Sequence, residues 1–98
     1  MMNNYILNGK TPVIEPVLLK WAEWFEKAER HIAKTKVGEA NVSTIFLGID
    51  HNFTGGIPIL FETMVFGGKL DQEEERYATW EEAERGHKEM VKRVKEAQ

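Results

Sequence analysis

The stretch that decides the fold lies in the middle of the chain, where residues 41–66 read NVSTIFLGIDHNFTGGIPILFETMVF. Its two ends, residues 41–50 and 59–66, are rich in β-branched and aromatic side chains, which favours strands. Residues 51–58 between them contain Gly55-Gly56 and are typical of a wide hairpin loop. Both runs carry apolar side chains on both faces, which indicates central strands, or a sheet covered on one side and paired on the other. This stretch therefore predicts an antiparallel hairpin at the centre of the fold.

On the N-terminal side, the chain predicts a small hairpin followed by a helix. Residues 4–8 and 11–14 flank Asn8-Gly9, a strong turn signal. We predict that a helix starts near Glu15 and Pro16, because both residues suit the first turn of a helix. The apolar side chains that recur every three or four residues are Leu18, Trp21, Phe25, Ala28 and Ile32, widened by Val17 and Trp24. The spacing predicts a helix that ends at residues 35–38.

On the C-terminal side, the chain predicts an edge strand and a second helix. Residues 71–75 are acidic and indicate a solvated turn, and residues 76–78 follow as a short edge strand. Thr79 and Glu82 have the spacing of a capping box. One apolar helical face then follows, made by Trp80, Ala83, His87, Met90, Val91, Val94 and Ala97. We predict an α+β fold of order β-α-β-β-(β)-α: a three- to four-stranded antiparallel sheet with two helices packed on one face.

The composition is that of a small globular protein. Its 98 residues fit one domain, residues 1–98, and 42% hydrophobic with 30% charged residues is an ordinary balance. The chain has no cysteine, which excludes a disulfide framework and a thiolate zinc site. A net charge of −3 offers no basic field for phosphates, so nucleic acid is disfavoured as a partner. We expect a cytoplasmic protein with no cofactor, no signal peptide and no membrane span.

Asp50 and His51, with Glu62 across the predicted hairpin, are the sharpest candidates for chemistry. A histidine and two carboxylates can hold a divalent metal or transfer a proton. The alternative is that Asp50 and His51 close the loop by bonding backbone groups, and we favour it because a few ligand-type residues fall short of a site. His31 and His87 lie on or beside helix stripes. Structural roles are favoured for both because their spacing matches no metal motif.

The hairpin loop is the second candidate. Its paired glycines belong to neither phosphate-binding motif, GxxxxGK[ST] or GxGxxG, so turn positions are expected. Phe53 at the loop tip is a contact residue if exposed and a lid on the core if buried. Trp21 and Trp24 lie about 60° apart around the helix, so one of them can face a partner. The tentative ligand- or partner-binding residues are Asp50, His51, Asn52, Phe53, Gly55, Gly56, Glu62 and Trp24.

Three blocks carry a resemblance to a known family: residues 21–53, residues 55–68 and ERYATWEEAERGH (residues 75–87). The more specific parts are STIFLGIDHNF (residues 43–53) and LFETMVFGG (residues 60–68). From about residue 18 to residue 87 the chain resembles a family of small proteins encoded by phages and prophages. The resemblance implies a phage setting and brings no catalytic residues with it.

Three functional hypotheses follow. The preferred one is a non-enzymatic phage accessory protein in the host cytoplasm that sequesters a host factor in counter-defence. Its partner is a host protein or a nucleotide-like signal, and a homo-oligomer is one expected form. The second is a small metal-assisted hydrolase or isomerase that uses Asp50, His51 and Glu62. The third is a virion structural or assembly protein. The first is preferred because the chain has no complete catalytic motif, many aromatic residues and an acidic charge.

Overall fold

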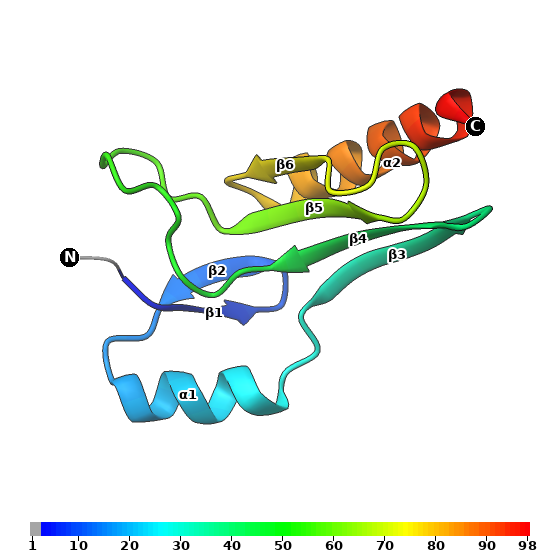
Figure 1. Cartoon of the computed structure of the whole chain (residues 1–98). Helices are drawn as coiled ribbons and strands as arrows, with labels where there is room; N and C mark the ends of the chain where they lie inside the picture. Colours follow the sequence, from blue (N-terminus) through cyan, green and yellow to red (C-terminus); the bar gives the residue numbers. More distant parts are fainter. Residues whose placement is uncertain (1–2) are drawn as a thin grey trace.

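A four-stranded antiparallel sheet with strand order β3-β4-β5-β6 forms the centre of the fold (Figure 1). The structure is a computed structural model and describes residues 3–98. The strands are β3 (His31–Val37), β4 (Ala40–Phe46), β5 (Phe61–Phe66) and β6 (Glu74–Tyr77). A second sheet holds β1 (Tyr5–Asn8) and β2 (Thr11–Ile14), and the helices are α1 (Leu18–Lys27) and α2 (Trp80–Ala97). The predicted α+β class is confirmed.

The predicted central hairpin is present as β4 and β5, which pair with Phe46 opposite Phe61. β4 ends at Phe46, four residues before the predicted end, where Gly48 takes a positive φ of 79° and lies against the ring of Phe25. A side chain at Gly48 would collide with that ring, so glycine is required at this position. The predicted N-terminal hairpin is also present as β1 and β2. The predicted edge strand is β6, which begins two residues earlier than expected.

The prediction that the first helix runs to residues 35–38 is wrong, because residues 31–37 form β3. The helix ends at Lys27, Ala28 is extended, and residues 31–37 pair with β4 instead. Along β3, buried Val37 faces α2 whereas Lys34 and Lys36 are exposed, which is the period of two of a strand. Gly38, with φ of 59°, then turns the chain directly into β4. Pairing with β4 therefore overrides the helical spacing that Ala28 and Ile32 continue.

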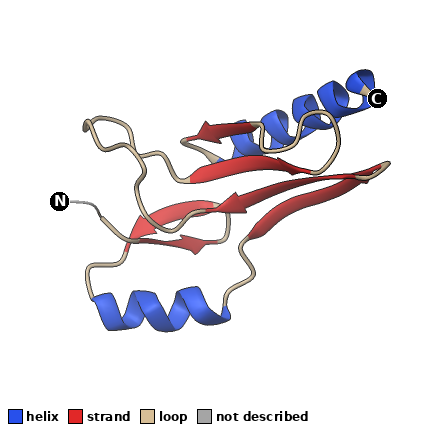
Figure 2. Ribbon diagram, viewed as in Figure 1, coloured by secondary structure: helices blue, strands red, loops and turns tan. Residues whose placement is uncertain are grey.

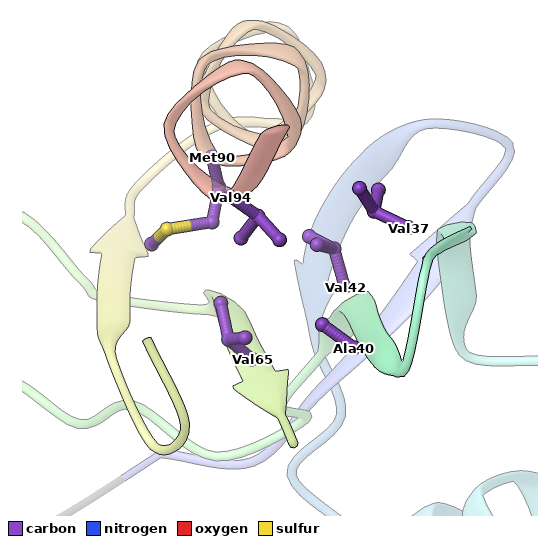
Figure 3. Packing of buried hydrophobic residues seen from close by; sticks show 6 residues of the cluster. All are labelled: Val37, Ala40, Val42, Val65, Met90 and Val94. Carbon is purple, nitrogen blue, oxygen red and sulfur yellow. The ribbon is translucent and has the colours of Figure 1, made fainter. Parts of the chain in front are cut away.

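α2 covers one face of the four-stranded sheet (Figure 3). The predicted capping box is present: the Thr79 hydroxyl accepts a hydrogen bond from the Glu82 backbone N–H, and the Glu82 carboxylate accepts one from the Thr79 N–H. A cluster of buried side chains fills the space between the helix and the sheet: Val37, Ala40, Val42 and Val65 from the sheet side, and Met90 and Val94 from the helix. The apolar stripe predicted for this helix is therefore what joins it to the sheet.

α1 packs against β1, whereas α2 alone packs along the four-stranded sheet. The Trp24 ring of α1 meets Phe46 on the sheet face that α2 covers, so both helices contact this face and α1 does so only at its end. The Trp21 indole N–H donates to the carbonyls of Tyr5 and Gly48, at 3.0 and 3.1 Å, and ties α1 to β1. A second buried cluster joins this part to the sheet, formed by Tyr5, Phe46, Leu60, Phe61 and Ala83. No residue of α1 is fully buried, so this helix lies on the surface.

Candidate binding surface

The loop between β4 and β5, residues 47–60, protrudes from one end of the sheet (Figure 2). The Asp50 carboxylate accepts hydrogen bonds from the backbone N–H groups of Asn52 and Ile59, at 2.8 and 2.9 Å. The Asn52 amide donates to the carbonyl of Ile57 at 2.9 Å and accepts from the hydroxyl of Thr54 at 2.9 Å. These bonds close the loop on itself. The loop-closing role considered for Asp50 is therefore confirmed.

The other polar loop residues are also used in holding the turn. The His51 ring donates from Nδ1 to the carbonyl of Ile49 at 2.8 Å, which fixes the proton on that nitrogen. Gly55 and Gly56 have φ of 85° and 97°, so both are turn residues in the left-handed region, as expected. The polar side chains of the loop thus serve its conformation, and the apolar ones are left at its surface.

Two large apolar side chains of this fixed loop face solvent. Phe53 is 70% exposed and Ile57 is 74% exposed. This exposure favours the interpretation of Phe53 as a contact residue over that of a lid on the core. The ring of Phe53 lies 5.9 Å from the ring of His51, between centroids. A loop with a defined hydrogen-bond pattern that exposes two such side chains is typical of a binding surface.

Four more exposed apolar side chains lie where β2 leads into α1: Ile14, Val17, Leu18 and Leu19, each at least 45% exposed. Val17 and Leu18 were predicted to belong to the packed stripe of the helix. They are exposed because the packing of α1 uses Trp21, Trp24 and Phe25, which lie further along the helix and are half-buried. We call the six residues Ile14, Val17, Leu18, Leu19, Phe53 and Ile57 the apolar end.

Backbone hydrogen bonds bring the three segments of the apolar end to one end of the molecule. Asn4 accepts from the N–H of Glu15 at 2.9 Å and forms a bridge with Ile49. Asn3 accepts from the N–H of Asp50 at 3.2 Å. The start of β1 therefore lies between the end of β2 and the base of the loop. Figure 1 shows the loop, the end of β2 and the start of α1 on the same side, at the left of the view.

The three candidates for metal or proton chemistry are not gathered around one point. Glu62 lies opposite Ile45 in the register, not opposite Asp50, which corrects the expected pairing across the hairpin. Its carboxylate accepts from Arg76 Nε at 2.9 Å. Across residues 3–98, no group of three or more His, Cys, Asp and Glu side chains is placed to hold a metal ion.

His87 is buried in α2 and bonds through both ring nitrogens. Nδ1 lies 2.7 Å from the hydroxyl of Thr44, and Nε2 lies 2.8 Å from the hydroxyl of Thr35. The chain of hydroxyls continues from Thr44 to Thr63 at 2.5 Å, and Tyr77 donates to Thr63 at 3.1 Å. If Tyr77 begins the chain as donor, each hydroxyl donates to the next and Thr44 donates to Nδ1, so the proton of His87 is on Nε2.

This arrangement gives His87 a structural role. Its burial lowers the pKa of the ring below the ordinary value, because the charged form loses its hydration. His31 lies on the edge strand β3, not on a helix as expected. The His31 backbone N–H donates to the Glu29 carboxylate at 2.8 Å, and the ring Nδ1 lies 3.0 Å from the same oxygen. The backbone hydrogen bond first, and the ring contact second, lower the pKa of Glu29.

Trp24 is half-buried and meets the ring of Phe46 edge to face, with centroids 5.8 Å apart. It therefore packs the second cluster rather than projecting at the apolar end. A surface hollow of about 410 Å³ lies elsewhere, beside α2, where Tyr77 and Gly86 contribute to its lining. None of the predicted site residues lines this hollow.

Sequence reasoning found Phe53 and missed the rest of the apolar end. A signal was available in the run Val17-Leu18-Leu19, because three consecutive helical positions span about 200° of the helix surface and one apolar stripe does not cover them all. Ile57 carried a second signal, since it is a large apolar residue in a glycine-containing loop just before a proline.

Comparisons with family models, with curated proteins and with solved structures find no match for this chain. In the part of the chain that the structure describes, neither helix has the length and apolarity needed to span a membrane.

Proposed function

We propose that this protein acts by binding a partner protein through the apolar end, and that its role is non-enzymatic. The observation that supports this is that the loop, the end of β2 and the start of α1 together expose six large apolar side chains on one side of the molecule, where backbone hydrogen bonds link the end of β2 and the base of the loop through β1. Scattered single apolar residues are normal on a surface, whereas a group of them at one place marks an interaction site.

The loop is suited to binding because its conformation is set before any partner arrives. Asp50 and Asn52 hold the turn, so the loop backbone that carries Phe53 and Ile57 loses little conformational freedom on binding. Burying two such side chains contributes on the order of 3 kcal/mol, a factor of about 100 in the dissociation constant. We therefore expect the strongest contacts at Phe53 and Ile57.

In the phage setting that the sequence blocks imply, the partner is a host protein in the cytoplasm, and binding would sequester it. The proposed use is counter-defence, in which the protein masks a surface that the host protein needs. The apolar end fits a protein surface better than a nucleotide, because the loop's amide and imidazole groups already bond within the loop.

The test compares proteins retained from a host-cell lysate by the wild type and by the double variant Phe53→Ser/Ile57→Ser. The matched control is Phe66→Ser, because Phe66 is also 50% exposed but lies on the four-stranded sheet, away from the loop. We expect the double variant to lose a partner that the wild type and the control retain, with about 100-fold weaker binding once that partner is purified. Equal retention by all three would refute the proposal.

A further inference from the structure

The face of the four-stranded sheet opposite α2 is not covered by a helix. α2 is the one helix of residues 3–98 with extensive contacts to this sheet, and it covers the face that carries Val42, Thr44 and Phe46. Side chains alternate along a strand, so the residues between these point to the other side. We call that side the open face.

The open face carries three rows of side chains across the strands, set by the register. The middle row reads, from β3 to β6, Lys34, Ser43, Met64 and Glu74. It is basic at one edge, apolar and small in the centre, and acidic at the other edge. All four side chains are at least partly exposed.

The rows on either side extend this pattern in part. Phe66 and Ile45 add apolar surface beside Met64, and Phe66 is 50% exposed. Lys36 adds a second positive charge on the β3 edge. On the β6 side, Arg76 pairs with Glu62 at 2.9 Å and also lies 3.9 Å from the carboxylate of Glu74, so the three side chains keep one net negative charge and Glu74 contributes it in the middle row.

We infer that the open face is a self-association surface whose occupant is the open face of a second copy of this chain. Two sheets pack with their strands within about 30° of each other. If the two-fold axis runs parallel to the strands, β3 of one copy lies over β6 of the other, and β4 lies over β5. Lys34 of each copy then faces Glu74 of the other, and the apolar centres meet.

The other aligned two-fold arrangement is disfavoured by charge. An axis perpendicular to the strands places β3 over β3, and Lys34 then faces Lys34 of the second copy. Like charges placed opposite each other oppose association, so charge selects the first arrangement. Pairing of the free edge of β3 with β3 of a second copy is disfavoured for the same reason. It would bring Lys34 and Lys36 of one copy close to the same lysines of the other.

The open face is small, so the dimer is weak. It offers about ten side chains per copy, roughly half of what a standard interface uses. We expect a dissociation constant on the order of 10–100 µM. This inference uses residues apart from the apolar end and does not rest on the proposed function.

Sedimentation of the full chain from about 5 µM to about 500 µM tests the inference. We expect a monomer–dimer equilibrium that Lys34→Glu weakens about tenfold, because the new carboxylate faces Glu74 in both halves of the interface. The double variant Lys34→Glu/Glu74→Lys exchanges the two charges and should restore association. Lys92→Glu is the matched control, since it makes the same charge change on an exposed position of α2 and should have no effect.

The inference is overturned by a monomer at every concentration, by a dimer that Lys34→Glu leaves unchanged, or by a charge exchange that fails to restore association. Thermal unfolding of each variant shows whether it is folded. We expect little loss of stability, because the side chains of Lys34 and Glu74 are both exposed. The double variant Phe53→Ser/Ile57→Ser should dimerise like the wild type. If it is the variant that abolishes the dimer, the apolar end is the self-association surface and the open face is not.

Discussion

Replacing Gly86 by alanine should destabilise the protein, although this change normally stabilises a helix. Gly86 lies inside α2, and its φ is not in the left-handed region, so backbone conformation does not require glycine there. A Cβ atom at this position would collide with the hydroxyl and ring of Tyr77. Glycine is needed to let the Tyr77 ring lie against the helix.

The magnitude follows from three opposing contributions. Alanine in a helix interior is favoured over glycine by about 1 kcal/mol. Displacing the Tyr77 ring costs about 1–3 kcal/mol as overpacking, and losing its hydrogen bond to Thr63 costs about 1 kcal/mol more. The net loss of unfolding free energy is therefore about 1–3 kcal/mol. In a chain of 98 residues that corresponds to a midpoint lowered by roughly 5–20 °C.

Chemical and thermal denaturation of Gly86→Ala and the wild type measure this difference, and a double-mutant cycle assigns its cause. In a Tyr77→Ala background there is no ring to displace, so Gly86→Ala should stabilise by about 1 kcal/mol. The predicted sign change is the decisive result. If Gly86→Ala stabilises the wild-type chain, or destabilises both backgrounds equally, the close contact with Tyr77 is not the reason that position 86 needs glycine.

Three further predictions concern stability. The unfolding free energy should fall as the pH drops below about 6.5, because burial lowers the pKa of His87 and the unfolded chain takes up the proton first; pH-dependent urea denaturation should show this slope in the wild type and not in His87→Gln. Thr79→Ala should cost about 1 kcal/mol by removing the cap of α2, whereas Thr79→Ser should cost little, as measured by thermal unfolding. Met90→Ala should cost about 2–5 kcal/mol because Met90 is 1% exposed, whereas Leu19→Ala at the apolar end should stay within about 0.5 kcal/mol by the same measurement.

The elements that the sequence predicted well are those with local signals. Thr79 and Glu82 form their capping box through contacts three residues apart, and Asn8-Gly9 forms its turn without help from distant residues. The central hairpin was predictable because its two runs are strongly β-forming and adjacent in the chain. In each case the short-range preference and the final structure agree.

The errors arose where distant contacts decide the outcome. Ala28 and Ile32 extend a helical spacing, yet the segment becomes β3 because β4 supplies backbone partners for it. The alternation of Lys34 and Lys36 with apolar or small neighbours, followed by a glycine turn, was the available signal for a strand. The exposure of Leu18 depends on which surfaces meet in three dimensions, and periodicity alone does not determine that.

The apolar end as a contact surface is the central claim, and site-specific photocrosslinking tests it most directly. A photoreactive amino acid would replace Phe53 in one variant and Lys92 in another, and both would be irradiated in cells of the proposed host. The account predicts a covalent adduct with a discrete partner protein from position 53 and none from position 92. No adduct from position 53, or the same adducts from both positions, would contradict it.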